Sequence, residues 1–128
     1  MSDNNSPCLF CALPPERICL ENDLAFVIHD GFPVTALHAL VIPKRHAVDY
    51  FALNQEELLA CDALLRQLKA VILQKDPAVT GFNIGMNAGK DAGQTIFHCH
   101  IHLIPRRHGD VQNPRGGIRH LIPGKGAY

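Results

Sequence analysis

One stretch of the chain has the spacing of a long amphipathic helix, and it limits what the rest of the sequence can form. After Asn54, apolar residues recur every three or four positions, as on one face of a helix. They are Leu58, Cys61, Leu64, Leu65, Leu68, Val71 and Ile72. Asn54 and Glu57 can form a capping box, and Asp76-Pro77 ends the pattern. A single helix with an apolar stripe needs another layer to cover it, so we expect a helix over 54–74 packed on a sheet.

Four segments outside this helix have the character of strands. Residues 24–29 and 38–43 are short apolar runs, whereas 81–87 and 95–104 alternate apolar and polar residues. The glycine-containing loop 88–94 should join the last two as an antiparallel hairpin, and the final strand should stop at Pro105. Strands gathered around one long helix predict an α+β domain with an antiparallel sheet.

Length and charge limit the domain count and the partners. The chain has 128 residues, 47% of them hydrophobic, which suits a single domain over 1–128. Glycines and prolines cluster after residue 105, so we expect an irregular C-terminal tail over 106–128. Twelve basic residues balance twelve acidic ones, which argues against non-specific binding of nucleic acid. The sequence shows neither a secretion signal nor a membrane-spanning run, so we expect a cytoplasmic protein with no membrane partner.

The run His98-Cys99-His100-Ile101-His102 concentrates side chains that can do chemistry. Alternate residues of a strand face the same side, so the three histidines should form a row at intervals of roughly 6 to 7 Å. Cys99 and Ile101 should then face the core. Packing alone is a poor explanation for three imidazoles, because each needs partners for two ring nitrogens. The residues alone leave three readings open: a solvated polar face, a metal site such as zinc, or a histidine nucleophile.

The five cysteines suit metal binding better than a disulfide framework. Their number is odd, and the one close pair is Cys8-x-x-Cys11. A structural zinc site needs four ligands, so this pair would need two partners from elsewhere. Cys19, Cys61 and Cys99 lie in apolar surroundings and are expected to be small buried hydrophobic residues.

The sequence from Gly93-Gln94-Thr95 to the three histidines resembles the signature of the histidine triad (HIT) family. The resemblance extends to His29-Asp30, to the run 38–46 and to the run 81–87, so it covers a core of about 8–105. It implies a HIT-like fold, with a five-stranded antiparallel sheet and one long helix, assembled as a homodimer. Within the family, the chain is most similar to compact bacterial members related to diadenosine polyphosphate hydrolases.

The same resemblance implies an activity and a role for each matched position. The enzyme would be a nucleotide hydrolase or nucleotidyl transferase with a purine nucleotide as substrate. It would cleave a phosphoanhydride or phosphoramidate bond at the α-phosphate of an adenosine nucleotide, such as a dinucleoside polyphosphate, without a catalytic cofactor. His100 would attack the phosphorus and form a nucleotidyl-histidine intermediate, while a backbone carbonyl holds its other ring nitrogen. The other implied catalytic residues are His38, Gln94 and His102, and the implied substrate-binding residues are Asp30, Asn87, Gly93 and Thr95.

The resemblance also completes the metal site. His46 and His98 match the two ligands that would join Cys8 and Cys11 around a structural zinc ion. Two other functions stay open at this point. One is a nucleotide-binding scaffold with little turnover and a structural zinc ion. The other is a metallohydrolase in which all three histidines of the row bind a catalytic ion.

Overall fold

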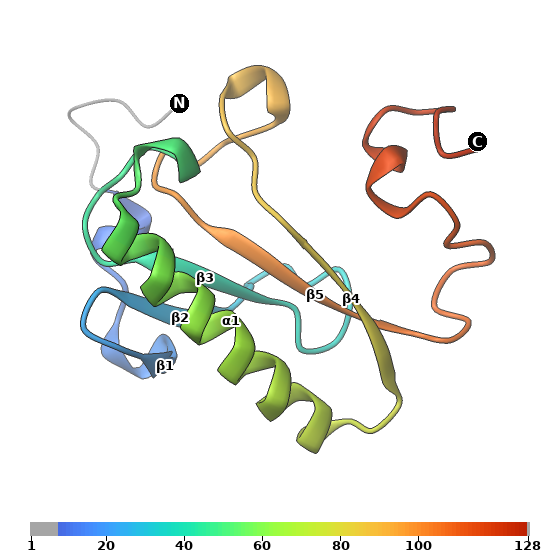
Figure 1. Cartoon of the computed structure of the whole chain (residues 1–128), viewed down its shortest axis with the longest axis horizontal. Coiled ribbons are helices and arrows are strands. Elements are labelled where there is room, and N and C mark those ends of the chain that lie inside the picture. Colours follow the sequence, from blue (N-terminus) through green and yellow to red (C-terminus); the bar gives the residue numbers. More distant parts are fainter. Residues whose placement is uncertain (1–7, 128) are drawn as a thin grey trace.

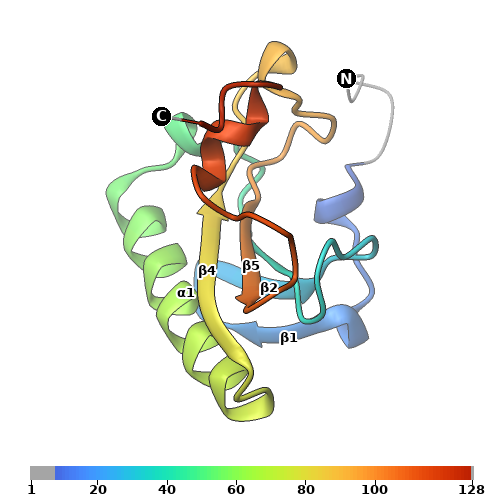
Figure 2. The same ribbon diagram turned by 90° about the vertical axis from the view of Figure 1, so that its right-hand side faces the viewer.

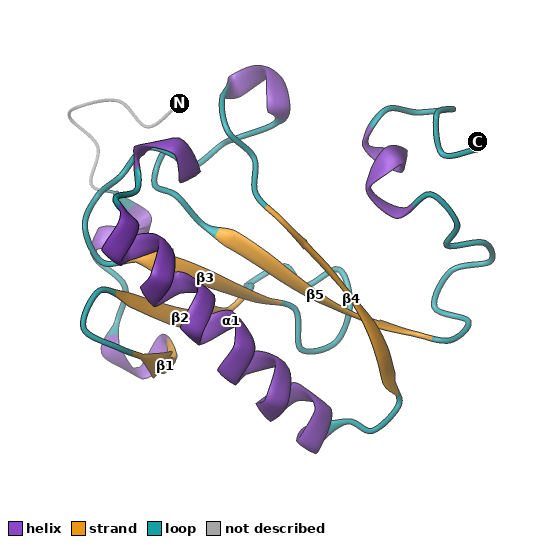
Figure 3. Cartoon of the chain, viewed as in Figure 1, coloured by secondary structure: helices purple, strands orange, loops and turns teal. Residues whose placement is uncertain are grey.

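The structure is a computed structural model that describes residues 8–127. Its centre is a five-stranded antiparallel sheet in the order β1-β2-β3-β5-β4, with one long helix across one face (Figures 1 and 3). The elements are β1 (Ile18–Glu21), β2 (Ala25–His29), β3 (Ala39–Pro43), α1 (Gln55–Lys75), β4 (Val79–Gly85) and β5 (Ile101–Arg107). The expected α+β class, with five strands and one long helix, is confirmed.

Helix α1 begins and ends where its local sequence predicts. The side chain of Asn54 accepts a hydrogen bond from the Glu57 N–H at 2.8 Å, and the Glu57 side chain accepts one from the Asn54 N–H at 3.0 Å. This is the expected capping box. The helix stops at Asp76. Its fully buried positions are Glu57, Cys61, Leu64, Leu68 and Ile72, while Leu58, Leu65 and Val71 are half-buried.

Two apolar clusters cover opposite faces of the sheet. The cluster under α1 includes Val27 and Val41 from the strands and Leu64 from the helix. Their strand neighbours Ile28 and Leu40 point the other way and pack with residues of the N-terminal segment 8–18. Figure 2 shows this segment in blue on the side of the sheet away from α1. The N-terminal segment thus forms the second covering layer.

The last strand differs from the expectation at both ends. It begins at Ile101 and not at Thr95, because residues 95–100 leave the ladder and the Cys99 N–H bonds instead to the Ala47 carbonyl at 2.7 Å. It also continues through Pro105 to Arg107, so the prediction that Pro105 ends it is wrong. Strand β3 pairs with β5 only from Ile101 to Leu103, so the missing N–H of Pro105 breaks no bond to β3.

The remaining differences are smaller. Strand β1 was not located from the sequence, and β4 starts and ends two residues earlier than expected. After β5, residues 108–127 are irregular apart from one short 3₁₀ turn, Gly117–Leu121, so the tail starts two residues later than the expected position 106, and residue 128 lies outside the described range. Over residues 8–127, no helix combines the length and the apolar character needed to cross a bilayer.

Candidate functional site

The histidine row lies on the face of the sheet away from α1. Cys99 and Ile101 are buried in the helix-side cluster, so the alternation expected from the sequence is confirmed even though residues 98–100 are not in the ladder. His98 is fully buried, whereas His100 and His102 are half-buried. The row therefore runs from the interior to an accessible surface.

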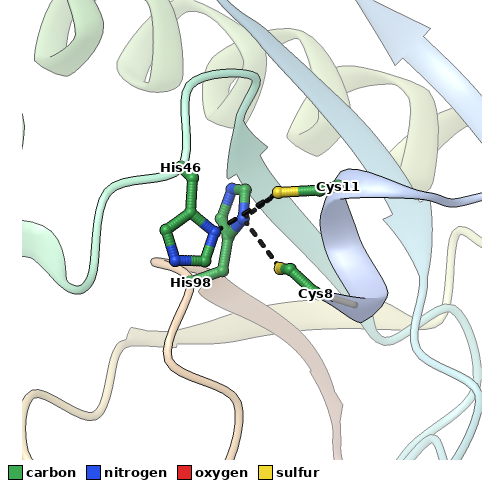
Figure 4. Close-up of side chains that lie close together, drawn as sticks. All are labelled: Cys8, Cys11, His46 and His98. Carbon is green, nitrogen blue, oxygen red and sulfur yellow. Dashed lines mark hydrogen bonds between the residues drawn. The ribbon is translucent and has the colours of Figure 1, made fainter. Parts of the chain in front are cut away.

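At its buried end, His98 meets the three other expected metal ligands (Figure 4). The ligand atoms of Cys8, Cys11, His46 and His98 all lie within 4.8 Å of one another. The Sγ to Nδ1 distances are 3.3 Å from Cys8 to His98, 3.3 Å from Cys11 to His46 and 3.4 Å from Cys11 to His98. Tetrahedral zinc, with bonds of about 2.3 Å to sulfur and 2.0 Å to nitrogen, would hold sulfur and nitrogen roughly 3.5 Å apart. The cluster thus has the donor types and the spacing of a zinc site.

The ring of His98 is in the tautomer that a metal ligand requires. Its Nε2 donates to the carbonyl of Pro43 at 2.7 Å, so Nδ1 carries a lone pair toward the two thiols. Burial lowers the pKa of His98, which favours the neutral, ligating form. The carbonyl of Pro43 therefore orients this ring as an outer-shell acceptor does in metal sites.

His100 has the opposite tautomer. Its Nδ1 donates to the backbone carbonyl of His98 at 2.8 Å, which leaves the lone pair on Nε2. The expectation that a backbone carbonyl holds the second nitrogen is confirmed. The half-buried side chain lines a pocket beside the row.

A chain of hydrogen bonds sets the protonation of His38 and His102. The Val34 N–H donates to His38 Nδ1 at 3.1 Å, so His38 carries its proton on Nε2. That nitrogen lies 2.9 Å from His102 Nδ1 and 3.4 Å from an Asp30 oxygen. The shorter contact is the better hydrogen bond, so His102 accepts at Nδ1 and keeps a proton on Nε2. The turn before His38 is tight, and Leu37 has a positive φ of 71°.

Both of these rings are neutral at neutral pH. Burial lowers the pKa of His102 to about 4, and the neighbouring rings of His100 and His38 add to the shift. Burial also lowers the pKa of His38, although the nearby carboxylate of Asp30 opposes this. His102 is therefore a neutral N–H donor at the pocket.

The pocket beside the row has a volume of about 320 Å³, within the range of small-molecule sites. Its lining combines apolar side chains with hydrogen-bonding groups. The apolar residues include Phe10, Leu13, Ile28, Leu40 and Ile96. The polar residues are Arg17, Asp30, Asn87, Thr95, His100 and His102. An apolar lining with a few polar groups is the general form of a small-molecule site.

The structure brings most of the expected site residues together. Asp30, Asn87, Gly93 and Thr95 line the pocket with His100 and His102, and His38 lies behind His102. Asp30 is also a turn residue, since one of its oxygens accepts the Phe32 N–H at 2.8 Å.

Gln94 is placed differently. It is 4% exposed and does not line the pocket. Its oxygen accepts the Gly89 N–H at 2.8 Å, and its Nε2 donates to the carbonyls of Val48 at 2.6 Å and Ile96 at 3.2 Å. Through these three hydrogen bonds, Gln94 stabilises the loop that carries Gly93 and Thr95.

Some pocket residues were not anticipated, and one cysteine was misassigned. Phe10, Leu13 and Arg17 come from the N-terminal segment, in which the sequence predicts only the two cysteine ligands. The apolar pair between Cys8 and Cys11 was the available signal. Cys61 and Cys99 are buried as expected, but Cys19 is exposed, and it lies at the register shift of the edge strand β1.

A second group of possible ligands consists of Asp30, His38 and His102. The Val34 N–H places the proton of His38 on Nε2, the atom that would have to bind the metal. Over residues 8–127, the three histidines of the row do not converge on one point. The geometry thus gives no support to a metallohydrolase that uses the whole row.

Comparison with known proteins agrees with this description. The HIT domain model matches residues 14–109. An uncharacterized 16.1 kDa HIT-like protein of Mycoplasma pneumoniae is 39% identical over 110 residues, which cover 83% of this chain and 74% of that protein.

Two similar solved structures have informative names. A hypothetical histidine triad nucleotide-binding protein from Sulfolobus tokodaii has a TM-score of 0.68 and 34% identity, covering 80% of this chain and 71% of that one. A Zn-bound histidine triad family protein from Mycobacterium smegmatis has a TM-score of 0.73 and 37% identity, covering 83% and 79%. With most of its length matched by the family model, this chain belongs to the HIT domain family.

Proposed function

We propose that this protein hydrolyses a purine nucleotide, or transfers its nucleotidyl group, by breaking a phosphoanhydride or phosphoramidate bond at the α-phosphate. The observation that carries the proposal is the tautomer of His100. Its Nδ1–H is held by a main-chain carbonyl, and the Nε2 lone pair belongs to a side chain that lines the pocket. An imidazole held in this way is a ready nucleophile.

The reaction proceeds in two displacements. In the first, His100 Nε2 forms a bond to the α-phosphorus while the bond to the leaving group breaks with its electron pair. The ring becomes cationic, and the His98 carbonyl stabilises it through the Nδ1–H bond. In the second, water attacks the phosphorus, the P–N bond breaks, and the proton lost by water goes to solvent, which replaces the proton that the leaving group took from solvent in the first displacement. The products are a nucleoside monophosphate and the protonated leaving group.

His102 stabilises the phosphate during both displacements. Its Nε2–H can donate to a non-bridging oxygen, and His38 keeps the proton on that nitrogen. Thr95 and Gly93 line the same pocket and are assigned to the phosphate and the bridging oxygen. Gln94 would have to exchange its present partners to donate directly, so we assign it the indirect role of fixing this loop.

The remaining pocket residues recognise the nucleoside. Asp30 has one oxygen bonded to the Phe32 N–H and can accept ribose hydroxyl groups with the other, while Asn87 is a second polar contact. The apolar lining suits the base. The similar protein from Sulfolobus tokodaii is named a nucleotide-binding protein, which supports this assignment.

We propose a structural zinc ion held by Cys8, Cys11, His46 and His98. When bound, it would supply a cross-link and no reactive group. The donor set and distances given above fit zinc, and the similar protein from Mycobacterium smegmatis is described as Zn-bound.

We also propose that the protein acts as a homodimer in the cytoplasm. Strand β4 is an edge of the sheet and carries Ile84, which is 49% exposed. A two-fold contact between two such edges would cover both.

The test is to trap the intermediate. The protein is incubated with a dinucleoside polyphosphate or an adenosine phosphoramidate, denatured rapidly, and digested for mass spectrometry. We expect an adenylyl group on His100, with turnover that survives a chelator applied too briefly to remove structural zinc. Turnover without any trapped group, abolished at once by the chelator, would contradict the proposal.

A further inference from the structure

Phe10 lies at the junction of the metal cluster and the pocket. It belongs to the 3₁₀ turn Leu9–Cys11, between the two cysteine ligands. Its ring is 6.0 Å from that of His98 and 5.0 Å from that of His100, centre to centre, and both contacts are edge-on. The same side chain lines the pocket. One residue thus touches a metal ligand, the proposed nucleophile and the space for the nucleotide.

Few contacts hold this turn on the sheet. Among the described residues, the backbone hydrogen bonds of the turn are local, from Cys11 to Cys8 and from Ala12 to Leu9. Between described residues, the other hydrogen bonds of residues 8–13 are the thiol–imidazole contacts of the metal cluster. Apart from these, the turn is held by the packing of Phe10 and its neighbours in the apolar cluster. The position of Phe10 therefore depends on the four-residue cluster together with this apolar packing.

We propose that Phe10 couples the metal site to the nucleotide pocket, so that the occupancy of the Cys8, Cys11, His46 and His98 cluster sets the affinity for the nucleotide. The inference rests on the proposed function, because it assumes that the pocket binds a nucleotide. A metal fixes the turn, the turn fixes the ring of Phe10, and the ring forms the pocket wall and supports one face of His100.

Coupling of this kind is reciprocal. If the metal strengthens nucleotide binding by some factor, the nucleotide strengthens metal binding by the same factor. Coupled sites commonly show factors of roughly 5 to 150. The metal then has a graded effect on substrate binding in addition to holding the fold together.

The experiment is a thermodynamic cycle with AMP as the probe, since AMP binding needs no turnover. Its dissociation constant is measured by calorimetry for the zinc-loaded and zinc-free forms of the wild type and of Phe10→Ala. In the wild type, removing zinc should weaken AMP binding by a factor within the range above. In Phe10→Ala, AMP binds more weakly from the start, and removing zinc should change its affinity less than twofold.

A second measurement uses only the loaded protein, so it does not depend on the zinc-free form staying folded. A chelating dye reports the rate of zinc release with and without saturating AMP. AMP should slow the release from the wild type and have no effect on Phe10→Ala. Phe10→Leu, which keeps an apolar side chain, replaces the alanine variant if that variant does not fold.

Phe26→Ala is the matched control. Phe26 has the same 6% exposure and lies in the same apolar cluster, but on β2 and outside the pocket lining. It should lower stability while keeping the zinc dependence of AMP binding. Equal AMP affinity with and without zinc in the wild type would overturn the coupling and leave the nucleotide site standing. No AMP binding to loaded wild type would overturn both, and full zinc dependence in Phe10→Ala would show that another path carries the coupling.

Discussion

Replacing Gln94 by alanine separates two roles for this residue, a loop brace and a direct donor to the substrate. The structure gives its amide three hydrogen bonds, to Gly89, Val48 and Ile96, at a position that is 4% exposed. Each buried bond contributes about 1 kcal/mol net. The contact to Ile96 is the longest of the three, so we expect Gln94→Ala to lower the free energy of unfolding by about 2 to 3 kcal/mol. At about 4 °C per kcal/mol for a chain of this size, the melting temperature should fall by about 8 to 12 °C.

The assay is urea unfolding followed by circular dichroism, with kcat and KM measured on the same samples. Gln67→Ala is the control, because Gln67 is exposed on α1 and its loss should change stability by less than about 0.5 kcal/mol. Gln94→Glu adds a second test, since a carboxylate can accept from the Gly89 N–H but cannot donate to the two carbonyls. Its destabilisation should shrink as the pH falls and the new carboxyl gains a proton. If Gln94→Ala lost activity more than tenfold with unchanged stability, Gln94 would act on the substrate and the reasoning from its hydrogen bonds would be refuted.

Four further predictions concern the site and the assembly. His100→Asn should abolish the trapped intermediate and lower kcat by about 10³-fold or more, and near-normal turnover would return the row to a metal-binding role. Zinc analysis should give close to one ion per chain, with Cys8 and Cys11 protected from alkylation while the exposed Cys19 reacts; free alkylation of all three would exclude the site. The pKa of His102 is about 4 in the folded protein and 6.5 in the reference state, so the unfolded chain binds more protons between these values. Its contribution to stability should therefore be full above pH 6.5 and fall as the pH drops toward 4. Urea unfolding at several pH values tests this, because the free energy of unfolding of His102→Asn should change less with pH than that of the wild type. Sedimentation at micromolar concentration should give a dimer, whereas a single monomeric species would exclude that assembly.

The parts of the fold that depend on residues close together in the sequence could be predicted from it. The capping box of Asn54 and Glu57 is complete within four residues, so the start of α1 was correctly placed. The opposite facing of His100 and Cys99 follows from the alternation of the chain alone. The boundaries of β5 depend on distant partners. The strand starts at Ile101, where its pairing with β3 begins. Pro105 is tolerated because the pairing with β3 extends only to Leu103.

The pocket was predicted only in part. Its polar residues follow a recognisable motif, so Asp30, Asn87 and Thr95 could be named in advance. Part of its apolar lining, Phe10 and Leu13, comes from a segment far away in the sequence, and the apolar pair between the two cysteines was the one local signal for it. For Gln94 the motif predicts a residue of the site, but it does not show where the side chain points. The amide of Gln94 bonds to the backbone of Gly89 and Val48.

The acceptor that holds His100 is a peptide oxygen. The metal cluster and the tautomer of His100 can therefore change independently in evolution. A substitution at position 98 would remove a metal ligand yet leave a carbonyl at the same point of the chain, beside His100 Nδ1. A lineage could thus lose the proposed metal ligands one at a time without changing which nitrogen of His100, the proposed nucleophile, is protonated. The loss of a ligand would affect the proposed catalysis through the shape of the pocket. Substitutions that refill the space around Phe10 could restore that shape.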